Sequence, residues 1–347
     1  MKAAILRKFG QSLSIEEVET PQPDADEVLI RVRAAGIDGT DLKLIEGFGY
    51  RPDLPFTTGH ESAGIVHEVG QDVTDFSPGD RVITYNFATC GDCFLCRSNR
   101  EQLCPNMTGI VGVRGIPGGH AEFLKLPARQ VVSFPESISF SDAAVLCDAG
   151  ITALHAVERS ELKSGETVAI IGVGGVGSYA IQFAKLAGAQ VIAVDVTDTK
   201  TERALELGAG AAINSSRQDV VHEIRRMTDG GGVDCVIDVV GKELTIAGGV
   251  ESLRNGGRIV IVGYTPEDYA LSGKRIAQNE LQIIGTRCGR KQDLMNTVRL
   301  VAEGKTQSIV TDQLPFEQIN EALSKLRAGE VLGRLVLQMP ESAFNAT

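Results

Sequence analysis

The sequence predicts an α/β protein of two domains, a barrel-like antiparallel β domain and a doubly wound parallel sheet. Three observations support this prediction. The chain has 347 residues, which is enough for about two domains of ordinary size. Short β-type runs separated by glycine and proline fill its first part, and strands alternate with helical segments from about residue 160.

The first 150 residues contain the short β-type runs. They are rich in valine and isoleucine, as at 28–32, 64–69 and 81–83. Strands at such close spacing are typical of an antiparallel barrel or sandwich. We therefore expect the first domain to be barrel-like.

The alternating pattern begins with the apolar run 167–171, which is typical of a parallel strand buried on both faces. The segments that follow predict helices at 178–186 and 201–207 and strands at 190–195, 233–238, 258–262 and 281–284. The last sixty residues predict helices at 293–303 and 316–327 and a final strand at 333–337. Strands that alternate with helices in this way indicate a doubly wound sheet.

A glycine-rich turn joins the first strand of this series to its helix, with the sequence Gly172-Val173-Gly174-Gly175-Val176-Gly177. The spacing G-x-G-x-x-G between a strand and a helix is the dinucleotide-binding fingerprint. Gly172 permits the tight turn, Gly174 lets a pyrophosphate approach the backbone, and Gly177 allows close packing of helix on strand. The N-terminus of the helix would offer free N–H groups to the phosphates.

Asp195 ends the second predicted strand, eighteen residues after Gly177. A carboxylate there can accept hydrogen bonds from the adenosine ribose and would repel a 2′-phosphate, which favours NAD over NADP. The alternative interpretation is a glycine-rich turn with a capping aspartate.

Four cysteines lie within fifteen residues, at Cys90, Cys93, Cys96 and Cys104. This spacing is typical of a loop around one tetrahedral zinc, and four thiolates leave no vacant position for a substrate. We therefore predict a structural zinc site, with a cysteine-rich loop without metal as the alternative. The three remaining cysteines are expected to be small core or loop residues, at Cys147, Cys235 and Cys288.

The net charge of −11, a pI near 5.1 and the lack of any lysine or arginine run argue against nucleic acid or an anionic membrane as the main partner. Neither a signal peptide nor a run of about 18 apolar residues is evident. Together with the clustered cysteines, this predicts a reducing, cytoplasmic location.

Several motifs together resemble one family, the zinc-dependent medium-chain alcohol dehydrogenases, over nearly the whole length of the chain. Besides the cysteine cluster and the glycine-rich turn, the motifs are Ala35-Gly36-Ile37-Asp38-Gly39-Thr40-Asp41, Gly59-His60-Glu61-Ser62-Ala63-Gly64 and Asp148-Ala149-Gly150-Ile151-Thr152. The resemblance implies a GroES-like catalytic domain, residues 1–150 and 286–347, with a structural zinc lobe at 85–110. This domain would be split in the sequence around a Rossmann domain, residues 151–285. It also implies two zinc ions per chain, NAD as cofactor and a homo-oligomer, either tetramer or dimer.

The resemblance also assigns site residues. Asp38, His60 and Asp148 would hold the catalytic zinc, and Glu61 matches an acidic residue that can bind the metal transiently. Thr40 would relay the substrate proton. Asp41 would orient the histidine, and Lys43 stands where some relatives have a histidine that ends the proton relay. Arg334 would contact the cofactor pyrophosphate and approach Glu61. Thr152 and Val176 would lie beside the nicotinamide.

Asp38 departs from the family, because most members have cysteine at that position. Aspartate keeps the charge of a thiolate but offers a harder oxygen, which should weaken zinc binding and widen the choice of metal. The alternative is that Asp38 holds no metal and the site is vacant or loosely filled.

The activity that the resemblance implies is hydride transfer between an alcohol and NAD, giving a ketone or aldehyde. Phe48, Tyr50 and Phe87 would line the pocket and suit a secondary or aromatic alcohol, unless they are core aromatics. A sugar or polyol dehydrogenase of the glucose or sorbitol type is the alternative, suggested by Asp38 and by Asn86 as a possible donor. A medium-chain reductase without catalytic zinc is a further alternative, and it requires the site of Asp38 to be empty.

Overall fold

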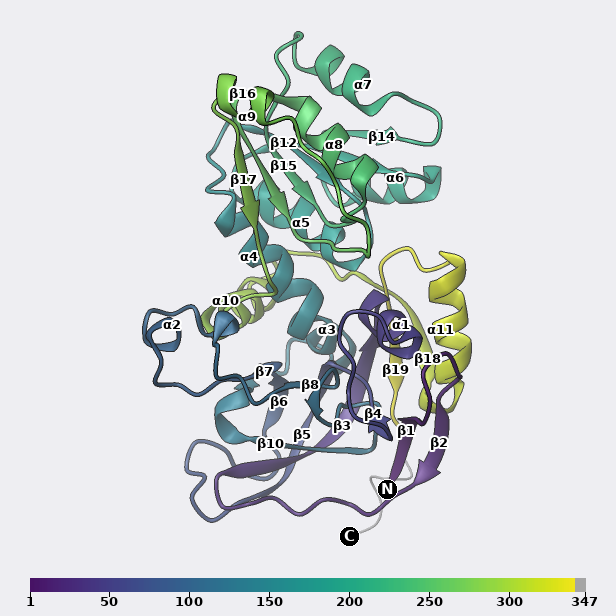
Figure 1. Cartoon of the computed structure of the whole chain (residues 1–347). Coiled ribbons are helices and arrows are strands. Elements are labelled where there is room, and N and C mark those ends of the chain that lie inside the picture. Colours follow the sequence, from purple (N-terminus) through teal and green to yellow (C-terminus); the bar gives the residue numbers. More distant parts are fainter. Residues whose placement is uncertain (341–347) are drawn as a thin grey trace. The chain divides into compact units, whose positions relative to one another are not determined.

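The computed structural model describes residues 1–340, and the chain divides into two compact units (Figure 1). The first unit contains Met1–Asp148, Arg290–Gly304 and the chain from Ser308 onward. The second contains Ala149–Gly289 and Lys305–Gln307. The domain boundaries predicted at 150/151 and 285/286 remain predictions, as do the functions given to the two domains. The last seven residues of the predicted segment 286–347 lie outside the described residues.

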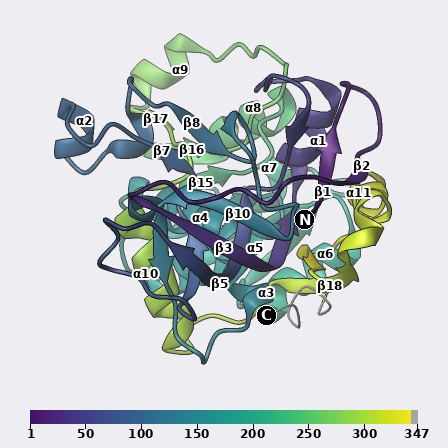
Figure 2. The same ribbon diagram turned by 90° about the horizontal axis from the view of Figure 1, so that it is seen from below.

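The first unit is built on a mainly antiparallel sheet of seven strands in the order β11-β6-β5-β3-β19-β18, with β10 paired to β3. These strands are β3 (Glu27–Ile37), β5 (Glu61–Val69), β6 (Arg81–Thr84), β10 (Phe123–Pro127), β11 (Val131–Ser133), β18 (Val310–Pro315) and β19 (Arg334–Gln338). Figure 2 shows β10, β3 and β5 side by side. The parallel pair β18–β19 is an exception to the expected antiparallel pattern.

Two small sheets complete the β structure of the first unit. One has the order β2-β1-β4 and the other β7-β8-β9. Their strands are β1 (Lys2–Leu6), β2 (Ser14–Glu17), β4 (Phe56–Thr57), β7 (Phe87–Ala88), β8 (Gly109–Val111) and β9 (Gly115–Ile116).

Helices cover this β structure and close its core. They are α1 (Gly39–Glu46), α2 (Phe94–Arg97), α3 (Phe140–Val145), α10 (Lys291–Ala302) and α11 (Ile319–Ala328), with 3-10 turns at Glu101–Leu103, Ala128–Gln130 and Phe316–Gln318. Alternating residues of β3, such as Val28, Ile30 and Val32, point into one apolar core with Phe316 and Leu323. The core therefore joins the beginning of the chain to its end.

The second unit is a six-stranded parallel sheet in the order β14-β13-β12-β15-β16-β17. Its strands are β12 (Thr167–Ile171), β13 (Gln190–Asp195), β14 (Ala211–Asn214), β15 (Val233–Asp238), β16 (Leu253–Ile261) and β17 (Gln282–Gly285). The connecting helices are α4 (Ile151–Arg159), α5 (Gly175–Leu186), α6 (Asp198–Glu206), α7 (Val220–Met227), α8 (Glu243–Ser252) and α9 (Gly273–Gln278). The strand order reverses at β12, as in a doubly wound Rossmann sheet, so the predicted fold class is confirmed.

One long helical segment was not expected from the sequence. The helix α3, a π-helical turn at Leu146–Gly150 and α4 follow each other without a break. This segment, Phe140–Arg159, is long and apolar enough to cross a membrane, but 83% of its most apolar 18-residue stretch is buried in the protein. Burial of that extent is typical of a core helix.

Candidate active site and metal centres

Asp38 occupies the junction between β3 and α1 and caps that helix. Its Oδ1 accepts hydrogen bonds from the N–H groups of Thr40, at 2.7 Å, and Asp41, at 3.3 Å. In return, Asp41 Oδ2 accepts from the Asp38 N–H at 3.0 Å, which completes a capping box. Asp38 thus has a structural task besides the metal binding that the resemblance implies.

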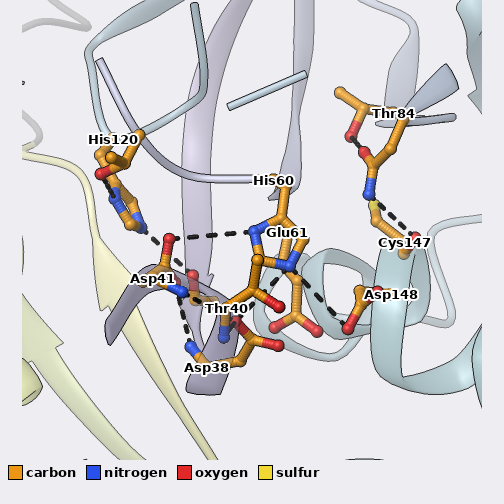
Figure 3. Close-up of polar contacts among 12 residues, drawn as sticks. Asp38, Thr40, Asp41, His60, Glu61, Thr84, His120, Cys147 and Asp148 are labelled. Atoms are coloured by element: carbon orange, nitrogen blue, oxygen red, sulfur yellow. Dashed lines mark hydrogen bonds and ion pairs between the residues drawn. The ribbon is translucent and has the colours of Figure 1, made fainter. Parts of the chain in front are cut away.

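The predicted metal ligands Asp38, His60 and Asp148 lie together in the first unit (Figure 3). The His60 Nε2 atom is 3.5 Å from Asp38 Oδ1 and 3.9 Å from Asp148 Oδ2. Ligand atoms about 2.1 Å from a tetrahedral zinc lie roughly 3.4 Å apart, so this spacing fits a zinc ion. His60 is only 3% exposed, and neither of its ring nitrogens has a hydrogen-bond partner among the described residues. A buried imidazole without hydrogen bonds is unfavourable, and a bound metal would satisfy it.

Glu61 follows His60 and is paired with Arg334 of β19. The Arg334 Nε atom lies 3.1 Å from both carboxylate oxygens, and Nη2 lies 2.9 Å from Oε1. The same Nη2 is 3.4 Å from Asp38 and 3.3 Å from Asp148. One guanidinium therefore contacts three carboxylates, all of which are predicted to bind the metal, Glu61 transiently.

Burial and the neighbouring positive charges shift the pKa values of Glu61 and Asp38 in opposite directions. Burial raises the pKa of Glu61 to about 8, although Arg334 opposes the change. Burial would also raise the pKa of Asp38, but the charges of His60 and Arg334 outweigh it and hold that pKa below its ordinary value.

Gly36 makes room for the Glu61 carboxylate. It faces Glu61 across the β3–β5 pair, and a Cβ atom at Gly36 would lie 2.0 Å from Glu61 Oε2. Any side chain at this position would displace the carboxylate.

Three further predicted residues surround His60. The fully buried Asp41 has its Oδ1 atom 3.8 Å from His60 Nδ1, and burial raises its pKa. Thr40 lies in the first turn of α1, and Lys43 in the same helix has its pKa lowered by partial burial against the opposing charges of Asp38 and Asp148. The buried His120 contacts Thr58 Oγ1 at 2.9 Å and the Gly36 carbonyl at 3.2 Å.

The four cysteines form a second cluster in the lobe between β7 and β8. Their sulfur atoms are 3.5 Å apart for Cys90–Cys104 and Cys93–Cys96, and 3.9 Å apart for Cys90–Cys96 and Cys93–Cys104. A tetrahedral zinc with Zn–S bonds of about 2.3 Å requires sulfurs roughly 3.8 Å apart. All four thiols are free of disulfides, so the cluster fits a closed, structural zinc site.

The glycine-rich turn lies in the second unit, between β12 and α5. Gly172 has a φ of +97°, which L side chains rarely adopt, and a Cβ at Gly177 would lie 1.8 Å from the Gly172 carbonyl oxygen. By contrast, a Cβ at Gly174, the N-cap of α5, would meet nothing within 4 Å. The turn therefore leaves open space at the helix N-terminus, as a bound phosphate requires.

Asp195 ends β13 and is bonded to this turn. Its Oδ2 atom accepts from the Val173 N–H, and its Oδ1 atom accepts from the Val196 N–H, both at 2.7 Å. Gly175 and Val176 begin α5, and Thr152 is the second residue of α4, so all the predicted cofactor residues except Arg334 lie in the second unit.

Comparisons with known proteins agree with this arrangement. The family model described as "Alcohol dehydrogenase GroES-like domain" matches residues 24–136, and that described as "Zinc-binding dehydrogenase" matches residues 175–303. An "Alcohol dehydrogenase" of Geobacillus stearothermophilus is 37% identical over 98% of this chain and all of its own length. An "NAD-dependent alcohol dehydrogenase" of Saccharolobus solfataricus is 35% identical over 97% of this chain and 99% of its own. The crystal structure of the alcohol dehydrogenase of Aeropyrum pernix has a TM-score of 0.91 and 36% identity, covering 97% of this chain and all of the other.

This chain belongs to the zinc-dependent medium-chain alcohol dehydrogenase family.

Within this alcohol dehydrogenase, the aromatic residues and Asn86 do not all lie as expected. Phe48 and Tyr50 are half-buried, whereas Phe87 is buried and its ring packs edge-on against Tyr85. The Asn86 amide donates to the Cys147 carbonyl at 3.3 Å and accepts from Thr84 Oγ1 at 3.3 Å. Sequence reasoning missed this contact, because Asn86 and Cys147 are 61 positions apart and neither belongs to a recognisable motif.

Proposed function

We propose that this chain is an NAD-dependent zinc alcohol dehydrogenase, which transfers hydride between an alcohol and NAD and gives a ketone or aldehyde. The observation that supports this most strongly is the cluster of His60, Asp38 and Asp148, whose buried imidazole has no hydrogen-bond partner within residues 1–340. When bound, zinc supplies a Lewis acid that lowers the pKa of an alcohol hydroxyl, and the nicotinamide is the hydride acceptor.

We assign the zinc-holding role to Asp38, His60 and Asp148, with Glu61 kept beside them by Arg334. Asp41 orients His60, because its buried carboxylate faces Nδ1 and favours the tautomer in which Nε2 is free for the metal. The three negative charges of ionised Asp38, Glu61 and Asp148 would be matched by the guanidinium and a divalent ion together. A structural zinc in the four-cysteine lobe brings the number of zinc ions to two per chain.

We assign proton transfer to Thr40, whose hydroxyl would pass the substrate proton toward solvent. Lys43, three residues later in α1, is half-buried and has its pKa lowered by burial, so it is suited to hold that proton briefly. The ion pairs of Arg334 use Nε and Nη2, and the contact with the cofactor pyrophosphate that the resemblance implies is kept as part of the proposal.

The dinucleotide is assigned to the turn Gly172–Gly177 with Asp195 at the ribose. Each Asp195 oxygen accepts one backbone hydrogen bond and keeps a second lone pair for a ribose hydroxyl. A 2′-phosphate would be repelled there, so we propose NAD rather than NADP. Replacing Asp195 by glycine, with a basic residue introduced next to it, should shift the preference toward NADP. A wild-type preference for NADP would contradict this assignment.

For the substrate we propose a secondary or aromatic alcohol, with the half-buried Phe48 and Tyr50 as lining residues. The sugar dehydrogenase alternative was suggested by Asp38 and by Asn86 as a possible donor, and one hydrogen of that amide is used by the Cys147 carbonyl. Several of the related proteins are alcohol dehydrogenases.

The test combines activity with metal analysis. Rates on NAD⁺ are measured with a secondary alcohol, an aromatic alcohol, glucose and sorbitol, and zinc is counted per chain. We expect two zinc ions and the highest rate on the alcohols. One zinc per chain with full activity would refute the catalytic zinc, and a higher rate on glucose or sorbitol would refute the substrate class.

We also propose that the enzyme is a cytoplasmic homo-oligomer, a tetramer or dimer. The edge strand β17 leaves Ile283 39% exposed, and Tyr264 and Tyr269 on the preceding segment are 43% and 38% exposed. Exposed apolar side chains beside an unpaired strand edge favour association with another chain. Size-exclusion chromatography with light scattering measures the oligomeric state directly.

A further inference from the structure

Behind the predicted metal ligands lies a buried polar contact that no predicted role requires. Thr84 ends β6 and Asn86 precedes β7, and the two side chains are 1% and 3% exposed. Thr84 Oγ1 donates to Asn86 Oδ1, and Asn86 Nδ2 donates to the carbonyl of Cys147, both at 3.3 Å. Figure 3 shows these contacts extending from Thr84 to Cys147, directly beside Asp148.

The accepting carbonyl has a particular place in the chain. It belongs to the peptide unit that joins Cys147 to Asp148, and a peptide unit is planar. Fixing the Cys147 carbonyl therefore fixes the orientation of the Asp148 backbone nitrogen and the position of the Asp148 Cα atom, from which its side chain extends. The hydroxyl of Thr84 in turn fixes the orientation of the Asn86 side-chain amide.

The segment that carries Asp148 needs such support. Leu146–Gly150 is a π-helical turn, a rare geometry that interrupts regular α-helical hydrogen bonding and frequently occurs at functional sites. A second contact connects Cys147 to the strand that follows His60. Cys147 Sγ donates to the carbonyl of Ser62 at 3.4 Å, two residues after His60. Cys147 thus links the turn that bears Asp148 to the strand that begins beside His60.

We propose that Asn86 is a positioning residue, which holds the Cys147 carbonyl and thereby sets Asp148 at the correct place to bind the catalytic metal. This inference rests on the proposed function, because it requires Asp38, His60 and Asp148 to hold zinc. Asn86 does not touch the metal or the substrate. It acts through the peptide unit that precedes a ligand, as residues behind metal ligands commonly do.

The test is a chelator titration of the zinc-loaded enzyme, with zinc release followed by a zinc-responsive dye. The Asn86→Leu variant keeps the size of the side chain and removes both hydrogen bonds. We expect it to release one zinc at roughly 10–100-fold lower chelator concentration than wild type, the effect typical of losing a group that supports a metal ligand. The zinc of the four-cysteine lobe is the internal reference and should be released as in wild type. With Co²⁺ bound at Asp38, His60 and Asp148, the visible absorption bands of the variant should shift from those of wild type, because the ligand geometry changes.

Gln130 provides a matched control. It is also a buried amide, 1% exposed, and donates through Nε2 to the carbonyl of Tyr85 at 3.2 Å, one residue before Asn86. The Gln130→Met variant removes an amide hydrogen bond to a backbone carbonyl in the same way, but this carbonyl lies outside the turn that carries Asp148. We expect its zinc release to match wild type.

Equal zinc release from Asn86→Leu and wild type would overturn the proposal, and so would an equal loss in Gln130→Met. If Asn86→Leu does not fold, Thr84→Val is measured instead. It removes the hydroxyl that orients the Asn86 amide and that also contacts the Cys147 thiol, and it should weaken the same zinc in the same direction. An unchanged affinity would overturn the proposal. A wild-type enzyme with a single zinc would refute the proposed function itself, which is a separate result.

Discussion

Two glycines of the dinucleotide turn should respond to the same substitution in opposite ways. A methyl group at Gly174 would meet nothing within 4 Å, and the residue has a φ of −91°, which alanine adopts without strain. Gly174→Ala should therefore fold normally, with stability unchanged or raised by about 0.4–1 kcal/mol. The new methyl group would occupy the space that we assign to the pyrophosphate. Loss of one charge-assisted hydrogen bond costs about 1.5–3 kcal/mol, so NAD should bind roughly 10–100-fold more weakly.

Gly177→Ala should instead reduce stability. Its Cβ atom would lie 1.8 Å from the Gly172 carbonyl oxygen and 2.9 Å from the carbonyl carbon, so the turn must open. Overpacking of this kind costs about 1–3 kcal/mol. For a domain of this size, the melting temperature falls by about 2–4 °C for each kcal/mol.

Both variants are compared with wild type by thermal melting without cofactor and by calorimetric titration with NAD⁺. Wild-type NAD affinity in Gly174→Ala would refute the placement of the pyrophosphate. Wild-type melting of Gly177→Ala would refute the packing argument.

Three further predictions concern the metals. The catalytic zinc of Asp38→Cys should be retained longer against a chelator, because sulfur favours zinc. Without metal, the variant should be about 0.5–2 kcal/mol less stable than wild type, because the cap of α1 is lost. Equal chelator resistance in both proteins would contradict the first expectation. Gly36→Ala should displace Glu61 and reduce zinc content after dialysis, whereas Gly39→Ala, with nothing within 4 Å of its Cβ, is the control and should keep it. Cys96→Ser should lower the melting temperature more than it lowers activity, because binding of the structural metal is part of the folding free energy; unchanged stability with lost activity would reverse the two zinc assignments.

The sequence predicted the parallel sheet best. Strands β13 and β15 begin and end at the predicted residues, because apolar runs buried on both faces have clear limits at polar neighbours. Helix α5 begins at Gly175, three residues earlier than expected, because glycine is a poor helix former and its helical role here depends on the turn.

The helical segment around Asp148 was missed for a physical reason. Asp148-Ala149-Gly150 has the composition of a loop, and only tertiary packing makes Leu146–Gly150 helical. The sequence alone does not distinguish the capping role of Asp38 from metal binding, because a cap and a metal ligand require the same side chain. Contacts such as Asn86 with Cys147 depend on how distant segments meet, which local patterns do not specify.

The place of Arg334 in the sequence has a consequence for how the protein is made. Arg334 and Asp38 are 296 positions apart, and strand β19 pairs with β3. The second unit lies almost entirely within one continuous segment, Ala149–Gly289, and can fold while the ribosome is still adding the end of the chain. The first unit must wait until β19 has been translated, because before then part of the edge of β3 is unpaired and Asp38 and Glu61 lack their counter-ion Arg334. A nascent chain arrested before β19 should therefore bind chaperones through its first 150 residues while its middle segment is already resistant to protease.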